Sequence, residues 1–215
     1  MVASSSPRLP AQLEPLVPVV EDHVRWEDAW IEGADLAGVT ASGVEIRRSR
    51  LTGCDLSGAQ MRGLSVQDCE LRTCNLANLT AMQAGMTRCR LKGCRLTGFA
   101  WPEASIDDVL FSDCLIDLAA FGFARMRRVR FEDCILRDAD FREARFDGVD
   151  FERCDLSGAA FGGARFERSR LRGCTLDGLT GVEGLRGVAM PWGDVIGLAG
   201  TLATALGIQV LDADE

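Results

Sequence analysis

Nine cysteines are the residues of this chain that could do the most chemistry, since a thiolate can attack a substrate, ligate zinc or form a disulfide. No Cys-x-x-Cys pair occurs, and a single histidine, His23, is present. The gaps between successive cysteines are all multiples of five, which points to a repeat rather than to a metal site. We expect reduced, buried thiols that pack as small hydrophobic residues. They are Cys54, Cys69, Cys74, Cys89, Cys94, Cys114, Cys134, Cys154 and Cys174.

Other groups that could catalyse a reaction are equally sparse. His23 lies before the repeats begin, and no serine or cysteine is paired with a base in the sequence. The many aspartates recur at regular spacing, as residues with a structural, solvent-facing role do. We therefore predict a protein that is not an enzyme and that needs no cofactor or metal.

The elements that carry these residues follow a five-residue pattern. From Trp26 to Leu176 every fifth residue is apolar, and the residue two positions earlier is usually small. This period fits neither a helix, whose apolar stripe recurs at every third or fourth position, nor a strand, whose side chains alternate. Glycine often follows two positions later, as at Gly33, Gly58 and Gly158, where the backbone can turn sharply. Each pentad therefore predicts one short side and one corner of a coil.

A longer period gives the number of sides. Seven cysteines, from Cys54 to Cys174, fall on every fourth pentad, so four pentads complete one turn of a square, parallel coil. About eight coils, spaced like neighbouring strands at about 4.8 Å, would form a rod of roughly 37 Å. Along such a rod, residues separated by four pentads stack on the same face.

The repeat resembles that of the pentapeptide-repeat proteins. Its blocks combine a small residue, Asp or Asn, Leu or Phe, a polar residue and often Gly, as in 34–38, 54–58, 139–143 and 154–158. The resemblance implies an all-β fold, a right-handed quadrilateral β-helix followed by a C-terminal α-helix. It also implies partners, because the best-studied relatives resemble duplex DNA in width and charge, bind DNA gyrase and protect it from quinolones.

We predict three regions. Residues 1–23 form an extended, capping segment, residues 24–180 the β-helix, and residues 181–215 a C-terminal cap with a helix at about 191–206. This helix is apolar on nearly every side, so it must be covered on more than one. The family's C-terminal helix dimerises, which implies a homodimer; packing within one monomer is the alternative. The candidate dimer residues are Trp192, Val195, Ile196, Leu198, Leu202 and Leu206.

Outward-facing residues divide the predicted surface. The net charge of −8 is concentrated on one face, here called the acidic face, and at the two ends. Oppositely charged residues alternate along another column, from Asp28 to Arg128, as an ion-pair ladder would require. A third side is flat, with small residues such as Gly63 and Ala120. The acidic face contains Asp35, Asp55, Asp117, Asp138, Asp155 and Asp177, and a candidate apolar patch contains Leu110, Leu115, Leu118, Phe123 and Ile135.

Two hypotheses of function follow. The first is a dimeric DNA mimic that modulates or protects DNA gyrase or another type II topoisomerase; the second is a scaffold that docks an unknown protein on the flat side or the apolar patch. Direct nucleic-acid binding through Arg125, Arg145 and Arg165 is disfavoured by the intervening acids. The chain shows neither a secretory leader nor a membrane-spanning run, so we expect a cytoplasmic protein with no membrane partner.

Overall fold

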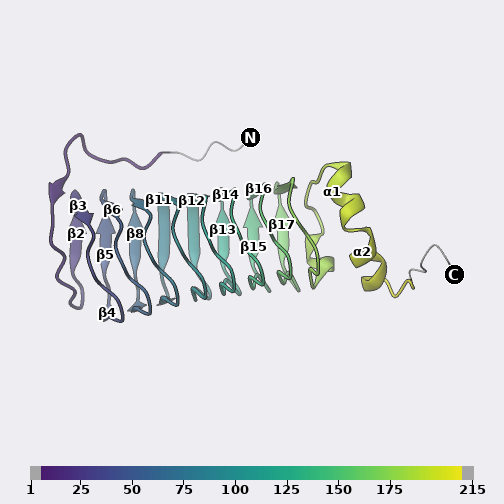
Figure 1. Ribbon diagram of the computed structural model, residues 1–215, viewed down its shortest axis with the longest axis horizontal. Helices are drawn as coiled ribbons and strands as arrows, with labels where there is room; N and C mark the ends of the chain where they lie inside the picture. The colour runs from purple at the N-terminus through teal and green to yellow at the C-terminus, as the bar shows by residue number, and fades with distance from the viewer. Residues whose placement is uncertain (1–5, 210–215) are drawn as a thin grey trace.

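The chain winds into a four-sided coil of short parallel strands (Figure 1). The computed structural model describes residues 6–209. Equivalent residues of successive turns are four pentads apart, as in the pairing of Trp26 with Ile46. Eight rungs stack on three of the sides, from the level of Trp26 to that of Leu176, joined by seven turns. The predicted all-β, four-sided helix is thereby confirmed.

Two adjacent sides consist of regular strands. On the side here called the β2 face, the rungs are β2 (Arg25–Glu27), β5 (Glu45–Arg47), β8 (Ser65–Gln67), the first halves of β11 (Gly85–Lys92) and β12 (Ser105–Ser112), β13 (Arg125–Arg127), β15 (Arg145–Asp147) and β17 (Arg165–Glu167). On the β3 face they are β3 (Ala29–Glu32), β6 (Arg50–Thr52), β9 (Glu70–Arg72), the second halves of β11 and β12, β14 (Arg130–Glu132), β16 (Asp150–Glu152) and β18 (Arg170–Arg172).

The other two sides are held by fewer hydrogen bonds. The acidic face follows the β3 face along the chain and consists of isolated parallel bridges, from Asp35–Asp55 to Asp155–Thr175. The fourth side, the β4 face, begins with β4 (Thr40–Ser42), β7 (Gln60–Arg62) and β10 (Thr80–Met82) and continues as bridges. The chain visits the sides in the order β2, β3, acidic and β4, so the acidic face lies opposite the β2 face.

Each corner depends on one residue in the left-handed backbone region. The residue two positions after the central apolar residue has a positive φ, such as 66° at Gly38 and 55° at Asp28. Glycine adopts this conformation without strain, whereas a bulky residue does so at a cost. Phe123, with φ 60°, is the bulkiest residue at such a corner among residues 6–209.

The interior is built from stacked columns of identical or similar side chains. Phe111, Phe131 and Phe151 stack with ring centroids 4.8 Å apart, at the spacing of neighbouring strands. A second phenylalanine column, from Phe121 to Phe161, stacks at 5.2–5.5 Å. The central apolar residues between Trp26 and Leu176 are buried, which confirms the five-residue frame read from the sequence.

The N-terminal segment first runs along the outside of the rod and then reaches the first coil, whose end it covers (Figure 1). Strand β1 (Glu14–Pro15) adds one rung to the β3 face by pairing with Ala29 and Trp30. The segment before it passes over later rungs: the Arg8 amide donates to the Asp68 carboxylate at 3.2 Å, and Arg90 donates to the Ser6 hydroxyl at 2.8 Å. It therefore covers part of the rod's side as well as its end.

The C-terminal end is closed by an irregular half-coil and two helices. The half-coil contains the 3₁₀ helix η1 (Val182–Leu185) and pairs with Arg170 through Ala189. The single helix predicted at about 191–206 is divided into α1 (Trp192–Gly197) and α2 (Ala199–Ala205). Gly193, Gly197 and Gly200 weaken helix propensity on both sides of the break. Within residues 6–209, no helix is both long and apolar enough to cross a membrane.

Candidate binding surfaces

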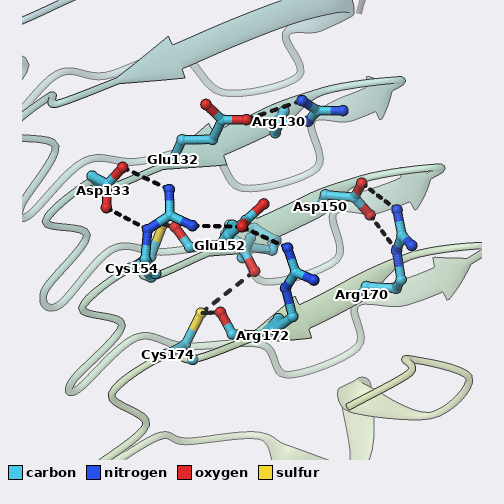
Figure 2. Close-up of polar contacts among 12 residues, drawn as sticks. Arg130, Glu132, Asp133, Asp150, Glu152, Cys154, Arg170, Arg172 and Cys174 are labelled. Atoms are coloured by element: carbon cyan, nitrogen blue, oxygen red, sulfur yellow. Dashed lines mark hydrogen bonds and ion pairs between the residues drawn. The ribbon is translucent and has the colours of Figure 1, made fainter. Parts of the chain in front are cut away.

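Ion pairs join successive turns on the β3 face and at its corner toward the C-terminal end of the coil (Figure 2). Arg170 donates two hydrogen bonds to Asp150, at 2.9 and 2.7 Å, and Arg153 binds Asp133 in the same two-pronged way at 2.7 and 2.8 Å. Arg172 reaches Glu152 at 2.6 Å. Each of these bonds joins residues on neighbouring turns, so they stabilise the register of the coil.

The alternating column from Asp28 to Arg128 contains ion pairs that join successive turns. Arg48 binds Asp28 at 2.7 Å and Arg88 binds Asp68 at 2.7 Å, both across one turn. At the end of the column, Arg128 binds Asp107, on the β2 face, at 2.6 Å. These pairs agree with the structural role predicted for the column.

Four of the six aspartates assigned to the acidic face accept hydrogen bonds from nearby residues. Asp55 accepts from the Ser57 amide at 2.8 Å and so caps its own turn, as short acidic side chains do. Asp35 and Asp155 accept from the amides two residues later at 3.1 Å. Asp117 accepts from the Thr97 hydroxyl at 2.7 Å. Even so, Asp35, Asp138 and Asp177 remain exposed.

For Asp55 and Asp155 the contacts lower the pKa of the carboxyl group. Hydrogen bonds from Ser57 hold the pKa of Asp55 below its usual range. The pKa of Asp155 is also lowered, because hydrogen bonds from Ser157 and Arg137 together outweigh the opposing effect of burial. The outward edges of this face, however, are not uniformly acidic. Between Asp55 and Asp155 the successive rungs present Asn75, Arg95, Leu115 and Ile135.

The five residues of the predicted apolar patch do not form one patch. Leu115 and Ile135 are bridge partners on the acidic face, whereas Leu110 lies on the β3 face. Leu118 and Phe123 are 59% and 62% exposed, at the two corners that bound the β4 face. The prediction grouped residues that are close in the chain. Because each pentad ends in a corner, residues about five positions apart lie on different sides of the rod.

The candidate dimer residues divide into a buried and an exposed set. Leu198 is only 1% exposed and packs on the last coil, with Leu202 partly buried beside it. Trp192, Ile196 and Leu206 are 75%, 59% and 77% exposed. Val195 is half-buried. One side of the two helices thus covers the end of the rod, and the other side presents large apolar residues to solvent.

The cysteines and His23 lie where a structural role requires. Eight thiols are buried and Cys174 is half-buried, and all nine are free. Burial raises the pKa of the Cys89 thiol well above its ordinary value, which keeps it protonated. The His23 ring lies against the corner at Gly43. Within residues 6–209, no cluster of three or more His, Cys, Asp or Glu side chains could hold a metal ion.

One feature of the surface was not identified from the sequence, and a second was identified but disfavoured as a nucleic-acid site. The N-terminal segment's contacts with Asp68 and Arg90 follow no local pattern. A row of arginines on the β2 face, by contrast, had a clear signal: Arg125, Arg145 and Arg165 recur on every fourth pentad, and Arg186 follows one position beyond the next expected place. Arg186 was missed because the five-residue frame ends before it.

The coil defines a parallel β-solenoid with a five-residue repeat and four sides. Three sequence models of one family match it: a "pentapeptide repeat region" over residues 84–161, "pentapeptide repeats (9 copies)" over 141–184 and "pentapeptide repeats (8 copies)" over 29–65. Together they cover well over half of the chain. The chain belongs to the pentapeptide-repeat family.

Solved structures of this family are also similar. HetL, described as a pentapeptide repeat protein involved in heterocyst differentiation regulation from the cyanobacterium Nostoc sp. strain PCC 7120, is 19% identical, with 80% of this chain and 91% of HetL covered and a TM-score of 0.40. A trypsin-treated form of QnrB1, described as a plasmid-mediated fluoroquinolone resistance protein, is 18% identical, with 90% and 100% covered and a TM-score of 0.40. No curated protein matches the chain.

Proposed function

We propose that this protein is a non-catalytic binding protein that acts in the cytoplasm, and that its acidic face docks on the basic DNA-binding surface of DNA gyrase or a related type II topoisomerase. The observation that supports this most is the acidic face, where Asp35, Asp55 and Asp155 lie on rungs of one side of the rod. Carboxylates at fixed spacing on a rigid support can occupy the positions of DNA phosphates, and their field would steer association with a basic surface.

The test is DNA supercoiling by purified gyrase, with and without a quinolone, at micromolar protein. We expect the wild-type protein to change supercoiling or to relieve quinolone inhibition. Reversing four charges of the acidic face should abolish the effect, whereas reversing four charges on the opposite face should not, although the net charge changes equally. The first variant carries lysine at Asp35, Asp55, Asp138 and Asp155; the second carries lysine at Glu103, Glu143, Glu167 and Glu183. No effect of the wild-type protein on either reaction would refute the proposal.

The exposed side of the C-terminal helices favours a homodimer. Trp192, Ile196 and Leu206 are large, exposed apolar residues at one end of the rod, where a second copy could cover them. A twofold contact there would join two rods end to end and double the length of the acidic face. Solution mass, measured by light scattering after size-exclusion chromatography, distinguishes this dimer from a monomer.

A scaffold that binds another protein is the second candidate function. Leu115 and Ile135 lie on adjacent rungs of the acidic face, with aspartates toward both ends of it. An apolar centre with a polar rim is typical of protein–protein interfaces. If this function is right, Leu115→Ser with Ile135→Ser would abolish partner binding, and charge reversal of the aspartates would weaken it only modestly.

A further inference from the structure

A row of like charges runs along the β2 face, on the side of the rod opposite the acidic face. Arg125, Arg145 and Arg165 are direct register partners in β13, β15 and β17. All three are exposed, and no ion pair within residues 6–209 joins any of them to a carboxylate. Like charges directly opposite one another destabilise a sheet. The row therefore costs the fold stability rather than contributing to it.

Earlier rungs of the β2 face show the arrangement that would stabilise the fold, in which an arginine pairs with a carboxylate on the next rung. At the N-terminal end of this face, Arg25 donates to Glu45 on the next rung at 2.8 Å. Most arginines of the neighbouring β3 face are likewise paired, as Arg170 is with Asp150. Only toward the C-terminal end does this column of the β2 face present three arginines in succession, so a role in folding does not account for them.

The row lines an open groove. Two adjoining surface pockets, of about 490 and 680 Å³, share Glu143 and Arg165 in their walls. The first extends to Phe123 and Arg125, and the second extends past η1 to Arg186. Four arginines about one rung apart therefore follow the groove from the corner at Phe123 to the last half-coil.

Phe123 supplies an apolar contact at one end of this groove. Its ring is 62% exposed although its backbone has φ 60°, a conformation that is costly for an aromatic residue. Glycine stands at the equivalent corner in other coils, for example Gly63 and Gly163. An exposed aromatic at a strained corner contributes nothing to the core, but it can anchor a ligand.

We propose that this groove binds an acidic, extended segment of a partner protein, whose carboxylates pair with Arg125, Arg145, Arg165 and Arg186 and whose apolar side chain packs on Phe123. The carboxylates already in the groove favour a peptide over a nucleic acid. Four glutamates, Glu103, Glu143, Glu167 and Glu183, alternate with the arginines along the groove. A continuous phosphate backbone would meet them, whereas a peptide can place its acids only where an arginine lies. Guanidinium groups bind carboxylates in a two-pronged geometry, which gives such a site specificity.

The test measures binding and stability on the same variants of the full chain. The probe is a fluorescent peptide of about twelve residues with alternating glutamates and one central tryptophan, long enough to span the groove; the same peptide with glutamine for glutamate is the control. Arg145→Glu would convert the row into an alternating ladder, so it should raise the melting temperature while weakening peptide binding at least about tenfold. Phe123→Ala should weaken binding without lowering the melting temperature.

A matched variant separates these effects from a general change in charge. Arg153→Glu breaks the pair with Asp133 outside the groove, so it should lower the melting temperature and leave peptide binding unchanged. Equal affinity of wild-type protein and Arg145→Glu for the acidic peptide, or no binding by the wild type, would overturn the proposal. Tighter binding of an oligothymidine of similar length, lost in Arg145→Glu, would assign the groove to nucleic acid instead. Because the acidic face lies opposite, these results do not depend on whether a topoisomerase is the partner.

Discussion

At the scale of single residues, two buried serines make hydrogen bonds that join neighbouring turns. Ser49 occupies an interior position that holds Cys, Ala or Val in most other pentads and is fully buried. Its hydroxyl accepts from the Ala29 amide at 3.0 Å and donates to the Arg47 carbonyl at 2.6 Å. Ser169 repeats this arrangement with the Val149 amide. In both places a small polar side chain provides the acceptor for an amide of the preceding turn.

Ser49→Ala should lower the free energy of unfolding by about 1–3 kcal/mol, because the buried Ala29 amide loses its acceptor. Ser105→Ala, at an exposed position of β12, should change it by less than about 0.5 kcal/mol. Urea denaturation followed by circular dichroism measures both. Equal stability of the two variants would mean that the Ser49 hydrogen bonds are not important for folding.

Asp68 links the stability of the fold to pH. Two hydrogen bonds from Arg88, at 2.8 and 2.7 Å, lower the pKa of this nearly buried carboxyl. A carboxyl whose pKa is lower in the folded state stabilises the fold above its unfolded pKa of about 3.9, and this contribution is lost as the pH falls through the folded pKa. Unfolding measured from pH 7 to pH 2 should therefore show stability falling in acid.

Asp68→Asn should be less stable than the wild type at pH 7, by about 1–3 kcal/mol, because Arg88 loses a charged partner. Its stability should also fall less steeply below pH 4, since one shifted carboxyl is gone. Asp28→Asn removes the same kind of pair in the same column from a less buried site, so it should have a smaller effect both at pH 7 and in acid. Parallel acid profiles for Asp68→Asn and wild type would contradict this account.

At the scale of elements, the sequence was most informative where the repeat is regular. The five-residue frame predicted the sides, the corners and the buried columns, because every rung sits on a copy of itself and leaves few alternatives. It was least informative at the ends. The helix predicted at about 191–206 forms two helices, and the path of the N-terminal segment over Asp68 and Arg90 depends on contacts between residues about 60 and 84 positions apart.

Surface contacts were harder to predict than the core, because the repeat fixes the position of a residue but not the partner of its side chain. The frame assigned six aspartates to one face, but it could not show that Asp55 caps its own turn or that Asp155 pairs with Arg137. It also could not group Leu118 and Phe123 correctly, since neighbours on the surface are residues one full turn apart rather than residues close in the chain. Side-chain partners are set by rotamers and competing contacts, which a repeat pattern does not encode.

The C-terminal helices combine two roles that can be separated by mutation. Leu198→Ala should destabilise the protein by about 2–5 kcal/mol, because it leaves a cavity over the last coil. Trp192→Ser, on the exposed side, should leave the unfolding of a monomer almost unchanged and, if two copies meet there, should lower the solution mass to that of one chain. A wild-type protein that is already a monomer at high micromolar concentration would exclude the dimer.

At the scale of the whole molecule, the rod separates its charges. The acidic face and the arginine row lie on opposite sides, and ion pairs between turns neutralise much of the surface between them. The coil holds these surfaces on opposite sides, so the two proposed sites would not compete with each other for space. This arrangement is the basis for the proposal that the protein acts by binding, with the coil as a support.

Competition with DNA tests that proposal most directly. Fluorescently labelled protein bound to DNA gyrase would be titrated with unlabelled duplex DNA, with the variant carrying lysine at Asp35, Asp55, Asp138 and Asp155 as the control. We expect duplex DNA to displace the wild-type protein from gyrase. The variant should not bind gyrase at the site that DNA occupies. A complex that holds DNA and the protein together at undiminished affinity would contradict the claim that the acidic face occupies the site of DNA.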